Sequence, residues 1–437
     1  MGASVVDKLH LTSFKSFRRA ELPLQDLTLL VGRNGSGKSN ALDGLWVLSR
    51  LAEGEDIRQA LDGGPDGPAV RGGVAGCAPF GQTDFTLGCE VRTGDERVDL
   101  EVTVQVEPAV QVVSERLRAW QDGWRELLTA DVSASSSLGG NVLAEVHDVA
   151  SGMHGKVAFR PARMLTAQVH TIVRPDEMGL RVHRAAGQVL AALRNVFLLD
   201  PIPHLMRQYV PRRDVELRRN AENLSAAAAR LLVDPGTGQR LRQALDQLNE
   251  QEVVDLGVAR SDLDDVMLTL VERWAGREHS VPVRLMSDGS LRFLAILVAL
   301  MQPEPIDEAV SSEEGFGMRT LVIEELEDGL HASQAATLVE LIREQVRQRP
   351  VRVLATAHSP ALLDALSGPE HAGVIVCQRA PDGTSALQRL TDLPAYLAVV
   401  AGGGLGRAAV EDRLRSTAAR PTSASALLDE ILRRPPA

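Results

Sequence analysis

The residues with the clearest chemistry form one run of eight, Gly32-Arg33-Asn34-Gly35-Ser36-Gly37-Lys38-Ser39. The run fits the phosphate-loop pattern G-x-x-x-x-G-K-S/T at every fixed position. Its glycines let the backbone wrap so closely that successive N–H groups point inward at phosphate oxygens. Lys38 would reach the β- and γ-phosphates, and Ser39 would place its hydroxyl on Mg²⁺. The run therefore predicts binding of a nucleoside triphosphate.

The elements on either side of this loop favour that interpretation over a chance Gly/Ser turn. The apolar run 27–31 precedes the loop as a strand would, and the amphipathic segment 40–51 follows it as a helix would. A helix that begins at the loop adds the positive end of its dipole to the phosphate site. This strand-loop-helix order is the context that the motif requires.

A second group of reactive side chains follows the apolar run 320–323, where two acids, Glu324 and Glu325, end a predicted strand. In this arrangement one carboxylate lies near Mg²⁺, usually through water, and the next lies beside the attacking water as a general base. The alternative is a strand that ends in a solvated acidic turn. The phosphate loop upstream favours the catalytic interpretation.

Two further motifs follow the same logic. His358 comes directly after the apolar run 351–355, and the carboxyl end of a sheet strand faces the crevice in which α/β proteins bind ligands, so it could contact the γ-phosphate. The segment 285–290, Leu-Met-Ser-Asp-Gly-Ser, opens the helix expected over 291–301 and offers a second anion site at a helix start. Two such helix starts suggest two chains facing each other across a nucleotide; a structural histidine and an ordinary N-capped helix are the alternatives.

Composition limits the class of protein. With 437 residues the chain is long enough for two or three domains. A net charge of −11 excludes a surface that is basic all over. The three cysteines have no zinc or disulfide spacing, the apolar run 293–301 is too short to span a membrane, and no signal peptide opens the chain, so we expect a cytoplasmic protein without a membrane partner.

Followed from its N-terminus to its C-terminus, the sequence predicts three parts. They are an N-terminal lobe over 1–106, a mostly helical insertion over 107–260 and a C-terminal lobe over 261–437. Apolar alternation predicts strands over 5–14, 20–31, 84–91, 98–106, 266–271 and 281–285, and short apolar runs predict buried strands over 319–323 and 351–355. Helical spacing predicts helices over 111–128, 216–233, 238–249 and 333–348. Glycine and proline make 54–81 a long loop, and the tail after Ala419 is expected to be loosely held.

With the four motifs in this order, the chain resembles the ABC-type ATPases of the SMC/RecF branch, close to the bacterial AAA family ATPases of the AAA_21-like group. The matching stretches are 9–43, 286–297, 321–331 and 355–364, roughly a quarter of the chain. The resemblance implies an α/β fold, a P-loop NTPase with an ABC-type ATPase head, a mixed β-sheet and an inserted, mainly helical arm or lid. It also implies Mg²⁺ as cofactor, ATP as substrate and a homodimer that sandwiches ATP.

The same resemblance assigns roles to individual residues. It implies that ATP is bound by the phosphate-loop residues Gly32, Arg33, Asn34, Gly35, Ser36, Gly37, Lys38, Ser39 and Asn40. It implies catalytic roles for Glu325, Lys38 and His358, and Mg²⁺ contacts from Ser39 and Glu324. The signature residues Ser287, Asp288 and Gly289 would complete the site of the facing chain.

Several positions depart from the family pattern. Glu324 stands where Asp is usual, Asp288 where many signatures have Gly, Ser290 where many have Gln, and His331 where an aspartate is expected. These departures bear on the hydrolysis rate more than on the fold. Gln82 is the candidate for the family's Mg²⁺-binding glutamine, with an ordinary polar loop residue as the favoured alternative.

The densest basic run consists of Arg207, Arg212, Arg213, Arg218 and Arg219. These arginines could contact nucleic-acid phosphates or an acidic partner, with a solvated helix start as the favoured alternative.

The function predicted is ATP binding and hydrolysis that opens and closes a dimer and moves the inserted arm. In the family, partners are commonly DNA ends, DNA-processing complexes or toxic effectors in anti-phage systems, which implies DNA or a separately encoded nuclease or toxin here. A slow or non-hydrolysing nucleotide switch is the alternative function. A transporter subunit is disfavoured by the long interval from Ser39 to Ser287, and a fused nuclease by the absence of a D-x-D pair in the 79 residues after His358.

Overall fold

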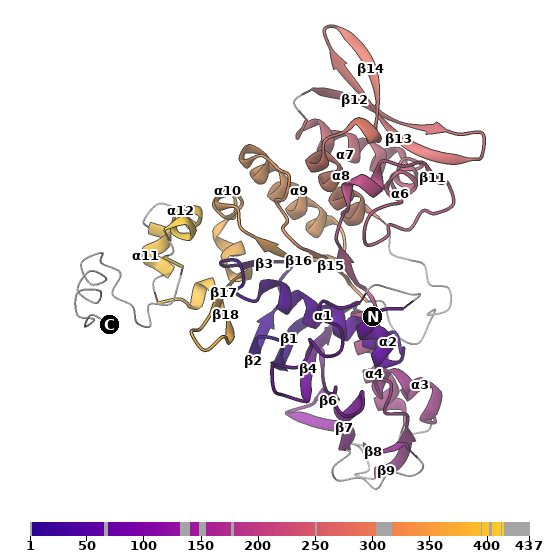
Figure 1. Ribbon diagram of the computed structural model, residues 1–437, viewed down its shortest axis with the longest axis vertical. Helices are drawn as coiled ribbons and strands as arrows, with labels where there is room; N and C mark the ends of the chain where they lie inside the picture. The colour runs from indigo at the N-terminus through magenta and orange to yellow at the C-terminus, as the bar shows by residue number, and fades with distance from the viewer. Residues whose placement is uncertain are drawn as a thin grey trace, which may run out of the picture.

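The computed structural model shows an elongated molecule with three β-sheets and helices packed between and beside them (Figure 1). It describes residues 2–64, 69–131, 140–147, 154–175, 179–249, 251–302, 317–394, 396–401, 404–411 and 413–414. In these residues no helix is long and apolar enough to cross a membrane. The tail expected to be loosely held after Ala419 lies outside the described residues.

A six-stranded sheet forms the centre of the fold and positions the predicted motifs. Its order is β10 (Val196–Leu199), β15 (Arg319–Ile323), β16 (Val351–Ala357), β3 (Leu27–Val31), β17 (Val374–Arg379) and β18 (Ser385–Arg389). All neighbours are parallel except the pair β17 and β18. Every residue of β16 is buried, including Arg352 and Thr356, and burial on both faces fits the mainly apolar sequence of this strand. The two buried strands predicted over 319–323 and 351–355 are confirmed.

An eight-stranded antiparallel sheet lies below the central sheet in the view of Figure 1. Its order is β2 (Phe17–Pro23), β1 (Ser4–Phe14), β4 (Asp84–Thr93), β5 (Glu96–Gln105), β6 (Gln111–Trp120), β7 (Trp124–Asp131), β8 (Val142–His147) and β9 (His154–Phe159). Helices α1 (Lys38–Ala52) and α4 (Leu180–Arg194) bury one face of this sheet in a continuous apolar core. The hairpin predicted around Thr93 to Asp95 is confirmed as β4 and β5.

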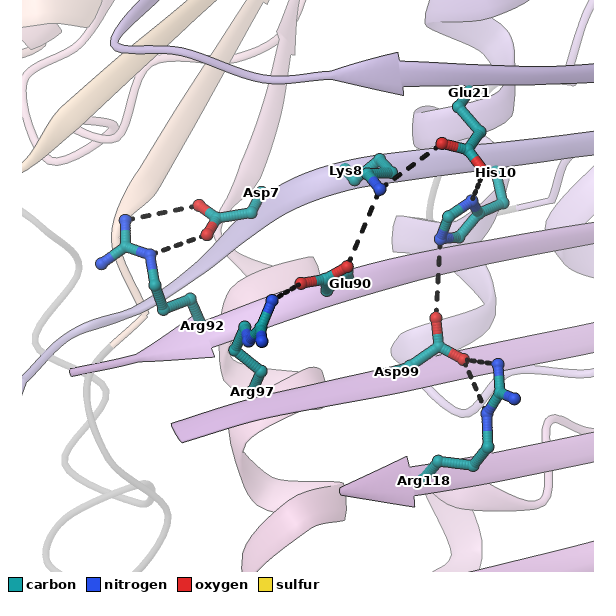
Figure 2. Close-up of polar contacts among 9 residues, drawn as sticks. All are labelled: Asp7, Lys8, His10, Glu21, Glu90, Arg92, Arg97, Asp99 and Arg118. Carbon is teal, nitrogen blue, oxygen red and sulfur yellow. Dashed lines mark hydrogen bonds and ion pairs between the residues drawn. The ribbon is translucent and has the colours of Figure 1, made fainter. Parts of the chain in front are cut away.

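The other face of this sheet carries a ladder of ion pairs (Figure 2). Asp99 on β5 accepts from the guanidinium of Arg118 at 2.6 Å and lies 3.5 Å from Nε2 of His10. Lys8 on β1 lies between Glu21 and Glu90 of the flanking strands. Charged side chains of opposite sign on neighbouring strands stabilise an uncovered sheet face.

The helix predicted over 111–128 is wrong, because this segment forms the strands β6 and β7 of the same sheet. The reason is two register shifts, one between Thr103 and Val104 on the partner strand β5 and one between Leu117 and Arg118. A bulge displaces the alternation of buried and exposed side chains, so that the apolar residues acquire a spacing that imitates a helix. Residues 107–260 are therefore only partly helical, and their division from the flanking parts stays a prediction.

An arm projects beyond the central sheet at one end of the molecule (Figure 1). It contains α5 (Pro203–Met206), β11 (Val210–Pro211), α6 (Leu224–Leu231), α7 (Pro235–Asp246), β12 (Glu252–Arg260), β13 (Asp265–Trp274) and β14 (Arg277–Pro282). Helices α6 and α7 pack on α8 (Asp288–Met301), which confirms helices within 216–233, 238–249 and 291–301. The strand predicted over 281–285 ends at Pro282, because Val283–Leu285 turns as a 3₁₀ helix towards α8.

The remaining helices pack on the central sheet or on other helices. They are α2 (Ile57–Asp62), α3 (Val169–Ile172), α9 (Ala335–Gln348), α10 (Pro360–Asp364), α11 (Tyr396–Ala401) and α12 (Leu405–Val410). Helix α9 confirms the helix predicted over 333–348, with Ala332–Gln334 as a 3₁₀ turn before it. Helix α2 interrupts the segment 54–81 that was expected to be a continuous loop.

Candidate functional site

The phosphate loop joins the buried strand β3 to the start of α1, as predicted. Its conformation requires glycine at two positions. A Cβ on Gly32 would lie 2.2 Å from the carbonyl oxygen of Cys377, and a Cβ on Gly37 would lie 2.5 Å from Oγ of Ser385. Gly37 also has a φ of 109°, a conformation that side chains strongly disfavour. The loop is thus fixed by close backbone approach to β17 and β18.

Lys38 is buried at the N-terminus of α1. Its Nζ donates to the carbonyl oxygen of Gly32 at 2.9 Å and to that of Arg33 at 3.1 Å. Burial lowers the pKa of the Lys38 ammonium, and the charges of Glu325, Glu327 and Glu324 oppose that shift. An ammonium that holds the loop from within is placed to contact an anion that the loop surrounds.

One open cavity of about 280 Å³ brings the predicted residues of the loop, the acids and the histidine together. Its lining consists of Asn34, Gly35, Gly37, Lys38, Ser39, Asn40, Glu324, Glu325, Thr356, His358 and Arg379. The parallel pairing of β15, β16 and β3 explains this, because their carboxyl ends meet at one edge of the sheet. Gly32, Arg33 and Ser36 line an adjoining cleft that shares His358 and Arg379 with the cavity.

The predicted general base, Glu325, has a fixed backbone. Its φ of 51° lies in the left-handed region, and its N–H donates to Oγ1 of the buried Thr356 at 2.8 Å. A non-glycine residue is rarely found in this region and needs its surroundings to hold it there. Thr356 on β16 therefore orients the carboxylate that follows β15.

The loops after β15 and β16 are also tied together by Glu327. Its Oε1 accepts hydrogen bonds from the backbone N–H groups of His358 and, at 2.6 Å, of Ser359. Burial and the nearby Lys38 ammonium lower the pKa of the His358 imidazole, against the charges of Glu327 and Glu325. A neutral imidazole thus faces, at neutral pH, the cavity that Glu325 also lines.

Arg71 contacts the candidate site, and the sequence analysis did not single it out. Its Nη1 donates to Oε1 of Glu324 at 3.0 Å, and its Nη2 donates to Oδ1 of Asp43 at 3.1 Å. Lys15 reaches the other oxygen of Asp43 at 2.7 Å and the carbonyl oxygen of Arg71 at 2.8 Å. Because Arg71 lies in a glycine-rich loop without a motif, only its charge could have suggested it.

The donor set in the cavity fits Mg²⁺. The Ser39 hydroxyl and the Glu324 carboxylate line the same cavity, and hard oxygen donors are the ligands that this ion prefers. The described residues contain no group of three or more His, Cys, Asp or Glu side chains that could hold a metal by themselves. Mg²⁺ needs only a few protein ligands when substrate phosphates and water complete its coordination shell.

The signature residues lie at the N-terminus of α8 and do not line this cavity. The Ser287 hydroxyl accepts from the N–H of Ser290 at 3.1 Å and caps the helix. Arg207 holds the segment before the cap, with its Nη2 2.7 Å from the carbonyl oxygen of Met286 and 2.8 Å from Oδ1 of Asp288. Ser287 and Asp288 are exposed, so this helix start is open to a neighbouring molecule.

Gln82 and the basic run 207–219 do not line the cavity of Lys38. Gln82 lines a neighbouring cavity of about 640 Å³ with Asn40, Arg71, Phe17 and Phe80, and not the cavity of Lys38. Most arginines of the basic run form ion pairs within the chain. Beyond the contacts of Arg207, it forms the pairs Arg212 with Asp264, Arg218 with Asp214 and Glu222, and Arg219 with Asp200.

Family models match two segments of the chain. Residues 165–364 match the family described as "AAA domain, putative AbiEii toxin, Type IV TA system", and residues 5–66 match the "AAA ATPase domain". Among curated proteins, the chromosome partition protein Smc of Methanococcus voltae is 37% identical over 54 residues, which are 12% of this chain and 4% of Smc. The match to Smc thus spans a small part of that protein.

Solved structures resemble the chain at low sequence identity. The SmcHead bound to the C-winged helix domain of ScpA is 12% identical, with 88% of this chain and 97% of that chain covered and a TM-score of 0.48. The SMC head domain from Thermotoga maritima is 13% identical, with 88% and 98% covered and a TM-score of 0.39. The recombination mediator protein RecF bound to ATP is 10% identical, with 82% and 94% covered and a TM-score of 0.35.

The phosphate loop, the acids after β15 and the histidine after β16, assembled on one sheet edge, define a P-loop NTPase. The model of residues 5–66 includes the phosphate loop and the model of residues 165–364 includes the two acids and the histidine, so the resemblance to AAA family ATPases inferred from the four motifs is confirmed.

Proposed function

We propose that the chain binds ATP with Mg²⁺ and hydrolyses it, and that two copies close on the nucleotide. The observation that carries the proposal is the single cavity in which Lys38, Ser39, Glu324, Glu325 and His358 come together. These are the groups that phosphoryl transfer to water needs, a cradle for the phosphates, a metal ligand and a group that activates the water.

The residues of the chain divide this work. The loop N–H groups and Lys38 bind the β- and γ-phosphates. Ser39 and Glu324 would hold Mg²⁺, which would supply positive charge to the phosphate oxygens. Glu325, oriented by Thr356, accepts the proton of the attacking water. The neutral His358 ring, which lines the same cavity, contacts the γ-phosphate.

The nucleoside part of ATP has room beside the phosphates. The cavity of about 640 Å³ shares Asn40 and Arg379 with the phosphate cavity. Phe17 and Phe80 line it, and Phe80 is fully exposed. Because Phe17 is fully buried, Phe80 is the ring that suits the face of a base.

The signature supports the two-chain arrangement. Ser287 stands outside the cavity of its own chain, at an exposed helix start whose N–H groups favour an anion, and Gly289 is buried beside it against Gly329. In a closed homodimer they complete the site of the facing copy. We place this activity in the cytoplasm, in DNA processing or in anti-phage defence with a separately encoded nuclease or toxin. The description of the matched family, which names a toxin system, supports the second setting.

The experiment is steady-state ATPase activity of the purified protein beside Glu325→Gln and Lys38→Ala, with the mass followed by light scattering. We expect Glu325→Gln to bind ATP, lose turnover and accumulate as a dimer, whereas Lys38→Ala loses the nucleotide. A Glu325→Gln protein that stays monomeric with saturating Mg-ATP contradicts the sandwich.

A nucleotide switch that hardly turns over is the second candidate, and the ion pair between Arg71 and Glu324 favours it, because the carboxylate for the metal already has a cationic partner. Single-turnover measurements separate the two functions. A switch shows tight ATP binding and dimer formation in the wild type without release of phosphate over the lifetime of the complex.

A further inference from the structure

A second polar cavity, of about 320 Å³, lies at the end of the eight-stranded sheet where β5, β6 and β7 meet the first turns of α4. Its charged and aromatic lining includes Arg97, Trp120, Arg125, Arg181 and Arg184, with Glu96 as its one acid. It shares no residue with the cavity of Lys38. Three segments distant in the sequence thus bring four guanidinium groups to one place in a chain of net charge −11.

Two of the four arginines are held in place by partners. Arg184 pairs with Glu96 at 2.7 Å. Arg97 pairs with Glu90 at 3.4 Å, and its guanidinium lies 4.7 Å from the centre of the Trp120 ring. These contacts fix the wall of the cavity and neutralise part of its charge.

The other two arginines keep their charge available. Among the described residues, no carboxylate lies within 4.0 Å of Arg125 or Arg181, and Arg181 donates a 3.3 Å hydrogen bond to the side-chain oxygen of Gln121. Both side chains are exposed. Guanidinium groups without a carboxylate bind phosphate oxygens well, because their planar donors match the geometry of the anion.

Trp120 gives the cavity a second kind of contact. The ring is 44% exposed at the tip of the β6–β7 hairpin, and the ring of Trp124 supports it edge-on at a centroid distance of 5.3 Å. A large aromatic side chain left open beside arginines is the combination that single-stranded nucleic acid uses, with bases on the rings and phosphates on the cations.

We propose that this cavity binds a single-stranded segment of nucleic acid, with phosphates on Arg125 and Arg181 and an unstacked base against Trp120. A duplex keeps its bases stacked inside, so that it cannot present one to a ring within a cavity. An acidic peptide would use the arginines and leave the exposed indole without a role. The basic run 207–219 is a poorer candidate, because most of it is paired within the chain.

The proposal is tested by the fluorescence anisotropy of a labelled 15-nucleotide thymidine strand titrated with the full chain at several salt concentrations. Arg125→Ala combined with Arg181→Ala should weaken binding at least about tenfold, as expected for losing contacts to charged groups. The slope of log affinity against log salt should become shallower by about 1.4, since each phosphate contact on a single strand contributes about 0.7. Trp120→Phe should weaken binding less than Trp120→Leu, because phenylalanine keeps a stacking face.

The matched control is Arg213→Ala combined with Arg277→Ala, which removes the same charge from two exposed arginines outside the cavity. It should leave the affinity within about twofold. Equal losses in the two double variants would overturn the proposal, because they would show a non-specific charge effect. Thymidine monophosphate that competes as well as the strand would assign the cavity to a free nucleotide, and binding of a glutamate-rich peptide in place of the strand would assign it to an acidic partner; both outcomes overturn the proposal. Because the readout is binding without ATP, its failure is distinguishable from failure of the ATPase function.

Discussion

Arg71 and Glu324 are 253 residues apart in the sequence, and their side chains form an ion pair with Nη1 3.0 Å from Oε1. Glu324 is also the carboxylate proposed to hold Mg²⁺. The guanidinium thus occupies Oε1 of the carboxylate that would hold the metal, and the second nitrogen of Arg71 is anchored on Asp43. We therefore expect this ion pair to compete with binding of the metal.

The first prediction follows from that competition. Arg71→Ala should lower the Mg²⁺ concentration that gives half-maximal ATPase activity by about twofold to fivefold, since partly exposed ion pairs contribute about 0.2–1 kcal/mol. A Mg²⁺ titration at saturating ATP measures it. Arg92→Ala, which removes a guanidinium paired with Asp7 on the open sheet face, is the control and should change nothing. A higher Mg²⁺ requirement in Arg71→Ala would show instead that the guanidinium assists the phosphates.

The second prediction concerns the threonine that orients the general base. Thr356→Val keeps the shape of the side chain and removes the acceptor for the N–H of Glu325. An unpaired N–H in a strained backbone costs about 1–3 kcal/mol, so the loop should leave its working conformation and turnover should fall about tenfold or more. ATP affinity, set by the phosphate loop, should change little. Thr356→Ser should restore most of the turnover, and a loss of affinity equal to the loss of turnover would argue against a positioning role.

These relationships show where the sequence is informative. The three short apolar runs over 27–31, 319–323 and 351–355 predict buried parallel strands, and parallel strands bring the residues that follow them to one edge. The cavity that unites Lys38, Glu325 and His358 could therefore be predicted from local patterns alone.

Long-range contacts could not be predicted from such local patterns. The partner of Glu324 comes from a glycine-rich segment whose path no periodicity specifies, and Glu327 ties two loops through backbone N–H groups that any residue supplies. The strands β6 and β7 were missed because a bulge depends on the pairing of two strands and leaves only a displaced alternation in each.

The third prediction tests the signature through its glycine. A Cβ on Gly289 would lie 1.9 Å from the carbonyl oxygen of Gly329, in the loop that follows Glu325. Gly289→Ala must therefore displace that contact, at a typical cost of about 1–3 kcal/mol for overpacking. We expect the ATP-dependent dimer to weaken strongly in light scattering while each chain still binds ATP. Gly236→Ala, where the nearest atom lies 3.5 Å away, is the control. An unchanged dimer affinity in Gly289→Ala would show that the signature is not part of the interface.

The last prediction concerns a buried carboxyl group outside both cavities. Glu115 on β6 is 1% exposed and accepts from the N–H groups of Leu165 at 2.7 Å and Thr166 at 2.5 Å. Burial raises the pKa of this carboxyl from 4.5 to about 7, against the pull of those hydrogen bonds. The folded state thus retains a proton that the unfolded chain releases between pH 4.5 and pH 7.

The sign of the effect follows from linkage. Because the folded state binds more protons in that range, the contribution of Glu115 to the free energy of unfolding is fully present below about pH 4.5 and is lost as the pH rises to about 7. A shift of this size corresponds to about 3 kcal/mol. Urea unfolding of the wild type and of Glu115→Gln at pH 5, 6, 7 and 8 measures it. The wild type should lose stability relative to the variant across this series and level off above pH 7, since glutamine does not titrate. Parallel curves for the two proteins would show that the two N–H donors keep Glu115 ionised throughout.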